Sequence, residues 1–61
     1  MLIKELKDER GEWMGSIEEC NQGGYIAYVL VDSFLDDIYD KHFQKISDCE
    51  KFIKDHYLMH G

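Results

Sequence analysis

Apolar and polar residues alternate in two stretches of the first twenty positions of the chain. Residues 1–7 (MLIKELK) follow a period of two, which is the side-chain period of a β-strand. Residues 12–20 alternate again, and this period places Trp13, Gly15 and Ile17 on one face. The pattern therefore predicts two strands, at about 1–7 and 12–20, joined by a tight turn.

The middle of the chain predicts a third strand and leaves the next segment open. Residues 25–32 begin with YIAYVLV, a β-branched and aromatic run that is apolar on both faces, as expected of a central strand. Residues 33–46 fit either a helical stripe or a loop followed by a strand at about 38–44. We favour the loop and strand, because the last element begins so soon afterwards.

The C-terminal segment has the pattern of an amphipathic helix at about 48–60. Ser47 and Glu50 have the spacing of a capping box, in which each side chain bonds the backbone N–H of the other. The apolar stripe follows at helical spacing and comprises Cys49, Phe52, Ile53, His56, Tyr57 and His60.

Together these elements predict an α+β fold in a single domain, residues 1–61. It is a small antiparallel meander of three to four strands with one C-terminal helix packed on it. The ending Tyr39-x3-Phe43-x3-Ser47-x2-Glu50-x-Phe52-Ile53 resembles small β-β-β-α modules such as integrase arm-type and AP2-like DNA-binding domains. The resemblance implies this architecture. Those domains carry Arg and Lys on the sheet, where this sequence carries Glu and Asp.

The charge of the chain is unevenly distributed. Thirteen Asp and Glu face seven Lys and Arg, for a net charge of −6, which disfavours direct contact with nucleic acid. Residues 11–40 contain no Lys or Arg. Their seven acids are the candidate partner-binding residues: Glu12, Glu18, Glu19, Asp32, Asp36, Asp37 and Asp40.

Three interpretations of these acids remain open. They form a solvated face that aids solubility, a surface complementary to a basic protein partner, or a metal site. The spacing of the aspartates from Asp32 to Asp40 does not match an EF-hand loop, which needs alternating ligands, a central Gly and a terminal Glu.

Other candidate chemistry is weaker. Cys20 and Cys49 with His56 and His60 make up a Cys2His2 inventory, but neither cysteine belongs to a C-x2-C pair. Cys49 with His42 could form a cysteine–histidine pair, yet Cys49 lies on the apolar stripe and is expected in the core. We expect free thiols, no metal, no cofactor and no enzymatic activity.

The sequence contains no apolar run long enough to span a membrane and no visible secretory signal, so we expect a cytoplasmic protein.

We expect a small acidic binding protein of phage or mobile-element type, acting in the host cytoplasm if phage-encoded. It would block a basic nucleic-acid-binding surface of a host defence protein or nuclease, by class analogy with anti-CRISPR and DNA-mimic inhibitors. The alternative is a homo-oligomeric structural or regulatory subunit, for example a homodimer, whose acidity serves only solubility.

Overall fold

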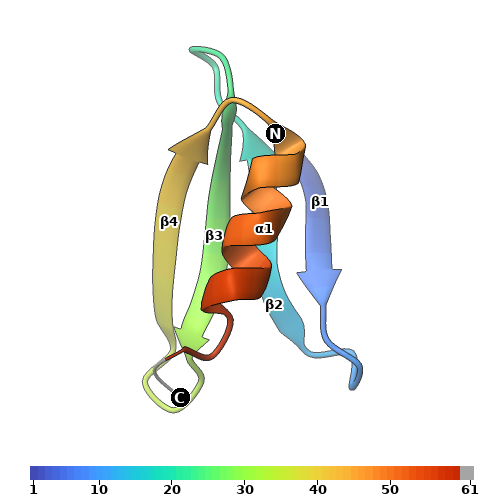
Figure 1. Cartoon of the computed structure of the whole chain (residues 1–61), viewed down its shortest axis with the longest axis vertical. Helices are drawn as coiled ribbons and strands as arrows, with labels where there is room; N and C mark the ends of the chain where they lie inside the picture. The colour runs from blue at the N-terminus through green and yellow to red at the C-terminus, as the bar shows by residue number, and fades with distance from the viewer. Residues whose placement is uncertain (60–61) are drawn as a thin grey trace.

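Four consecutive strands pair antiparallel with their neighbours, and one helix lies across a face of the resulting sheet (Figure 1). This computed structural model describes residues 1–59. The elements are β1 (Leu2–Lys7), β2 (Trp13–Glu19), β3 (Tyr25–Asp32), β4 (Asp37–Phe43) and α1 (Ile46–His56). The predicted α+β meander with a C-terminal helix is confirmed, and its sheet has four strands.

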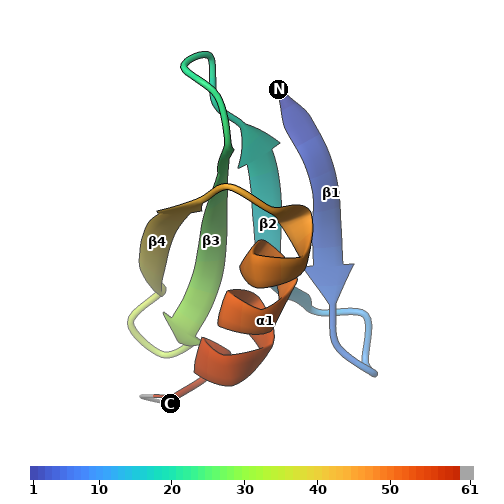
Figure 2. The same ribbon diagram turned by 45° about the horizontal axis from the view of Figure 1, so that its top comes forward.

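The core lies between α1 and the central strands. Figure 2 shows the helix lying over one face of the sheet. Its fully buried residues are Ile17, Ala27, Val29, Val31, Cys49 and Ile53. Alternate residues of β3 supply three of these side chains, because every second residue of a strand points to the same face. The helix supplies two more from successive turns.

A segment that the sequence left open, residues 33–46, is a turn followed by a strand. Residues 33–36 form the turn, and β4 begins at Asp37. The helical stripe in this segment has no counterpart, because Phe34 and Leu35 are exposed in the turn while Phe43 packs against the core from β4. The preferred prediction of a loop and a fourth strand is thus confirmed.

The helix begins earlier than predicted and without a capping box. Its N-cap is Lys45, which makes no side-chain cap hydrogen bond, so the predicted role of Ser47 is wrong. Ile46 packs against the core directly after β4, and this packing starts the helix two residues before the predicted position. Residues 57–59 form a turn after the helix, and residue 60, the predicted helix end, lies outside the described residues.

A β-bulge changes which side chains of β2 share a face. Leu6 pairs with Gly15 and Lys7 pairs with Trp13, so Met14 is an extra residue in the ladder. Met14 consequently packs against the core, and Trp13 points to the opposite face with Lys7. The prediction that Trp13 shares a face with Gly15 is therefore wrong, because strict alternation fails at a bulge.

Within residues 1–59, no element covers the sheet face opposite α1, which we call the open face. The strand register places both apolar and charged side chains on it: Leu2, Glu5, Lys7, Trp13, Ser16, Glu18, Ile26, Tyr28, Leu30, Ile38, Asp40 and His42. Among the described residues, no helix combines the length and the apolar character needed to cross a membrane.

Candidate partner-binding surface

The two turns that join β1 to β2 and β3 to β4 lie at the same end of the sheet, beside the C-terminal end of α1 (Figure 1). We call residues 8–12 and 32–37 the acidic end. Its six acids oppose a single base, Arg10, so it carries a charge of −5 out of the −6 of the whole chain. The acids are Asp8, Glu9, Glu12, Asp32, Asp36 and Asp37.

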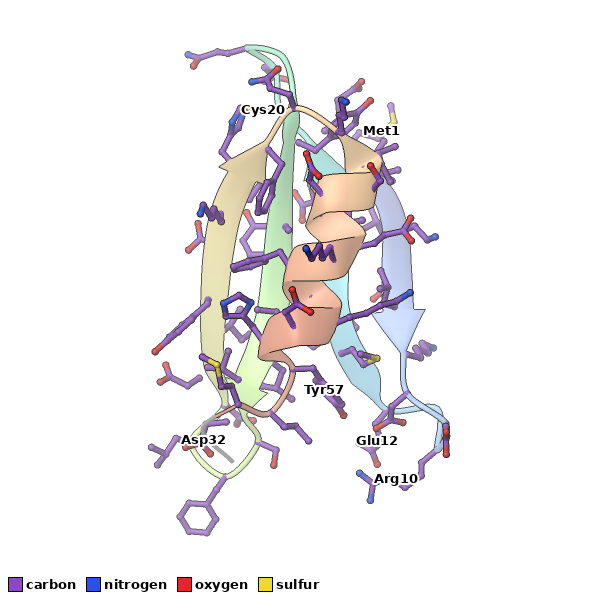
Figure 3. The ribbon with its side chains drawn as sticks, in the orientation of Figure 1. Met1, Arg10, Glu12, Cys20, Asp32 and Tyr57 are labelled. Carbon is purple, nitrogen blue, oxygen red and sulfur yellow. The ribbon has the colours of Figure 1, made fainter. Side chains whose placement is uncertain are left out.

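The two turns lie at opposite sides of this end of the sheet, with the C-terminal end of α1 between them (Figure 1 and Figure 3). In a flat sheet two such hairpins would be centred about 10 Å apart, and the twist of the strands spreads them further. The Debye length is about 10 Å at 0.1 M salt, so the fields of the two turns combine mainly at lower ionic strength. Within the second turn, Asp32 and Asp37 occupy directly opposite positions on β3 and β4.

The structure divides the seven predicted site residues into two groups. Four of them belong to the acidic end: Glu12, Asp32, Asp36 and Asp37. The other three do not: Glu18 and Asp40 lie on the open face, and Glu19 ends β2 at the opposite end of the sheet. Figure 3 shows Glu12 and Asp32 at one end and Cys20 at the other.

Sequence reasoning missed two members of the acidic end, Asp8 and Glu9. Bases at positions 4, 7 and 10 cancel their charge when residues 1–10 are summed. The predicted strands were enough to place Asp8 and Glu9 at this end, because a meander brings alternate turns to the same end of the sheet. Charge summed by turn, and not by sequence block, would have identified them.

The β3–β4 turn is held in shape by its own aspartates. One carboxylate oxygen of Asp32 accepts hydrogen bonds from the backbone N–H groups of Phe34 (2.9 Å) and Leu35 (3.2 Å). Asp36 adopts a positive φ of 54°, a left-handed conformation that Asp and Asn tolerate better than other side chains. This turn presents Phe34 at 93% exposure and Leu35 at 69% exposure at its apex.

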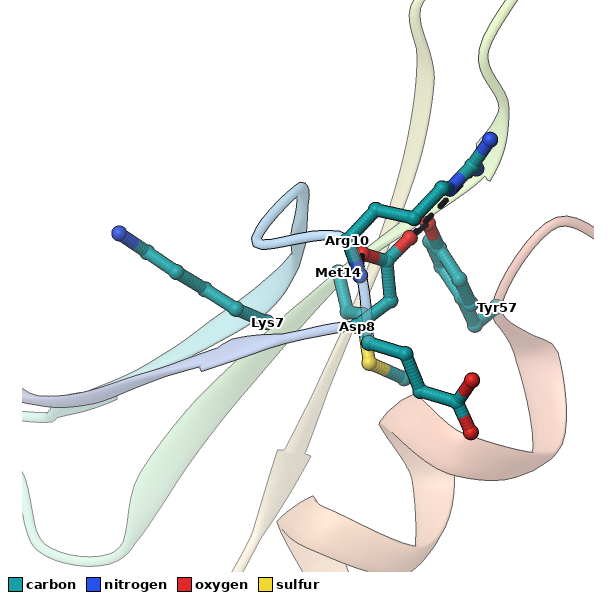
Figure 4. A pocket seen from close by; sticks show the side chains of 6 residues that line it. Lys7, Asp8, Arg10, Met14 and Tyr57 are labelled. Atoms are coloured by element: carbon teal, nitrogen blue, oxygen red, sulfur yellow. Dashed lines mark hydrogen bonds and ion pairs between the residues drawn. The ribbon is translucent and has the colours of Figure 1, made fainter.

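The β1–β2 turn is organised around Asp8. Its Oδ1 accepts the backbone N–H groups of Arg10 and Glu12, each at 2.9 Å, and its Oδ2 accepts the Tyr57 hydroxyl at 2.7 Å (Figure 4). The Tyr57 bond, followed by the Glu12 N–H, lowers the pKa of Asp8 below its usual value. The same bond raises the pKa of Tyr57, because it favours the protonated phenol beside a carboxylate.

An open depression of about 510 Å³ adjoins this turn. It is lined by Lys7, Asp8, Glu9, Arg10, Met14 and Tyr57, and the far end of the Lys7 side chain points away from the other labelled residues (Figure 4). Both carboxylate oxygens of Asp8 are already engaged by the turn and by Tyr57. The depression is therefore a shaped, charged surface in which the remaining carboxylate is that of the exposed Glu9.

The cysteine and histidine candidates are not brought together. Cys49 is fully buried, and burial followed by the nearby Asp48 raises the pKa of its thiol, which opposes thiolate chemistry. His42 donates from Nε2 to the Gly23 carbonyl (3.0 Å) on the open face, across the sheet from Cys49. Residues 1–59 contain no cluster of three metal-ligating side chains, and His60 lies outside the described residues.

No protein-family model, curated protein or solved structure matches this chain. Function is therefore inferred from the chemistry of the acidic end and of the open face.

Proposed function

We propose that this protein is a non-enzymatic binding protein whose acidic end binds a basic surface of a partner protein. The observation that carries the proposal is the gathering of six acids and one base on two adjacent turns at one end of the sheet. Carboxylates held on tight turns can pair with Lys and Arg, and a concentrated negative field accelerates encounter with a basic partner at low salt.

The acidic end is unfavourable for folding, which favours a functional origin. Like charges directly opposite each other in an antiparallel pair destabilise a sheet, and Asp32 and Asp37 are such a pair. Asp32 is needed for its hydrogen bonds to the turn, whereas the Asp37 carboxylate makes no hydrogen bond within residues 1–59. Local conflicts of this kind concentrate at functional sites.

The narrower form of the proposal concerns the partner. A basic surface that fits carboxylates is also one that fits nucleic-acid phosphates, since both are anionic acceptors for Lys and Arg. We therefore propose that the partner is a nucleic-acid-binding protein, such as a host defence protein or nuclease, and that this chain competes with nucleic acid for it.

The test uses two double variants with the same change in net charge. Asp36→Asn with Asp37→Asn removes two charges from the acidic end, and Asn is tolerated at the positive φ of residue 36. Glu18→Gln with Glu19→Gln removes two charges away from it. Basic proteins captured from cell lysate by the wild-type chain are identified by mass spectrometry, and the strongest binder is purified for titration.

We expect the Asp36/Asp37 variant to bind about 3- to 10-fold more weakly, as for the loss of two surface ion pairs, and the Glu18/Glu19 variant to bind almost normally. Wild-type affinity should fall with added salt, and a DNA duplex should compete for the partner. An affinity indifferent to salt and to both variants would contradict the proposal. Salt dependence without DNA competition would contradict only its narrower form.

A homo-oligomer formed through the open face is the second candidate. Ile38 is 48% exposed there, and Trp13, Tyr28 and Leu30 are only partly buried. Light scattering at several salt concentrations discriminates the two candidates. A stable dimer insensitive to salt would support the second candidate, whereas a monomer would remove it.

A further inference from the structure

Two adjacent apolar side chains stand at the apex of the β3–β4 turn, within the acidic end. Phe34 is 93% exposed and Leu35 is 69% exposed, and they follow directly on each other in a four-residue turn. Turn positions are usually occupied by Gly, Asn, Asp, Ser or Pro. An exposed Phe–Leu pair contributes nothing to this core, so its presence at an apex needs another reason.

The backbone of the apex is held by hydrogen bonds within its own turn. The Asp32 carboxylate holds the backbone N–H groups of Phe34 and Leu35, and Asp36 in the left-handed conformation returns the chain to β4. A fixed backbone reduces the entropy lost on association, and an aromatic side chain buries a large area with few rotatable bonds. This combination of a rigid backbone and an apolar tip is what a binding anchor requires.

We infer that Phe34, supported by Leu35, inserts into an apolar pocket of the partner protein and that Lys or Arg side chains surround that pocket. The basic rim follows from charge complementarity, because Asp32, Asp36 and Asp37 surround the apolar pair along the chain. The inference rests on the proposed function: the acids would provide attraction to basic surfaces, and the apolar tip would select among them.

Two other occupants fit the charges less well. A second copy of this chain would bring another net charge of −6 to the same place. A membrane with anionic headgroups would repel the three aspartates around the tip, which leaves an uncharged bilayer as the only favourable lipid surface. A basic protein with an apolar pocket complements both the apolar pair Phe34 and Leu35 and the three aspartates around it.

The test uses two synthetic peptides of equal length and equal positive charge as probes. In one, lysines flank a Leu-Phe-Leu run; in the other, they flank Ser-Gln-Ser. Binding to the wild-type chain, to Phe34→Ser and to Leu2→Ser is measured by calorimetry at several salt concentrations. Leu2→Ser is the matched control, because Leu2 is 52% exposed and lies at the other end of the sheet.

We expect the wild-type chain to bind the apolar peptide about 10- to 100-fold more tightly than the polar one, the range expected for burying one Phe side chain. Phe34→Ser should lower affinity for the apolar peptide to that for the polar one, with the salt dependence unchanged, and Leu2→Ser should have no effect. Because Phe34 is so exposed, its replacement should leave the circular dichroism spectrum and the unfolding midpoint unchanged.

The outcomes separate the two proposals. If the affinity depends on salt but is unchanged by Phe34→Ser, this inference is wrong and the proposed function is still supported. If the affinity does not change with salt, the proposed function is contradicted. Phe34-dependent cosedimentation with phosphatidylcholine vesicles would assign the tip to a membrane and overturn the inference. Phe34-dependent self-association in light scattering would assign it to a second copy, with the same result.

Discussion

At the scale of single residues, Asp8 connects the β1–β2 turn to the end of the helix. Its carboxylate joins two backbone N–H groups of its own turn to the hydroxyl of Tyr57, which is 49 positions away in the chain. This turn is one of the two that make up the acidic end, and Tyr57 is the C-cap residue of α1. This carboxylate therefore holds the turn against the layer of the helix.

The contribution of Asp8 to stability should depend on pH. Its pKa is lowered in the folded state, so the stabilisation is complete above the unfolded value of about 3.9 and is lost as the pH falls below it. The raised pKa of Tyr57 acts at the other extreme: its stabilisation is complete below about pH 10 and is lost as the pH rises further.

Urea unfolding of the wild type and of Asp8→Asn tests this pair. We expect the wild type to be more stable near neutral pH, and the difference between the two to shrink as the pH falls from about 5 to about 2.5. Tyr57→Phe should remove the alkaline component and reduce the acidic one, because the backbone N–H groups of Arg10 and Glu12 still bond Asp8. Arg10→Gln should largely retain both components. A difference between the wild type and Asp8→Asn that does not change with pH would contradict the assignment.

At the scale of elements, the close approach of α1 to β2 depends on a residue without a side chain. A Cβ atom at Gly15 would overlap the backbone carbonyl oxygen of Tyr28 and would lie 3.0 Å from Cγ2 of Ile53. The carbonyl belongs to the neighbouring strand and cannot move without breaking the sheet pairing at this position. Gly15 thus sets both the strand pairing and the distance of the helix.

Gly15→Ala should lower the free energy of unfolding by about 2–3 kcal/mol or more, the upper range for overpacking a core. Lys54→Ala, on the exposed side of the helix, is the control and should change it by less than about 0.5 kcal/mol. Chemical denaturation of the two variants provides the measurement. If Gly15→Ala unfolded at the wild-type urea concentration, the packing described for α1 and β2 would be incorrect.

The elements differ in how far the sequence could predict them. The apolar run of β3 carries its own signal, because β-branched and aromatic residues favour strands and its alternate residues Ala27, Val29 and Val31 form the core. The bulge at Met14 leaves no such signal, since alternation continues through it, and its position is set by pairing with β1. The helix start likewise depends on the packing of Ile46, which outweighs the local preference of Ser47 and Glu50.

The candidate site was predictable in part for a similar reason. Asp32, Asp36 and Asp37 are close in sequence, so their charge is visible in the chain itself. Asp8 and Glu9 lie at the same end of the sheet as these aspartates only because the strands form a meander. The same strand order places Glu19, at the end of β2, at the opposite end. The exposure of Phe34 could not be predicted from pattern alone, because its spacing also fits the apolar stripe of a helix.

At the scale of the whole molecule, the acidic end should make stability and partner binding respond to salt in opposite directions. The repulsion among six acids opposes folding, and two unit charges about 10 Å apart in water repel by about 0.4 kcal/mol. Salt screens this repulsion and should stabilise the fold. The same screening weakens attraction to a basic partner.

Raising sodium chloride from about 0.05 M to about 0.5 M should therefore increase the free energy of unfolding by about 1 kcal/mol. The Asp36→Asn, Asp37→Asn variant should be more stable than the wild type at low salt, because it removes the like-charge pair at Asp32 and Asp37, and it should gain less from added salt. Urea denaturation of both chains at the two salt concentrations measures this. Equal salt responses would mean that the acids of the two turns do not interact, and the proposed cooperation between them in attracting a partner would lose its physical basis.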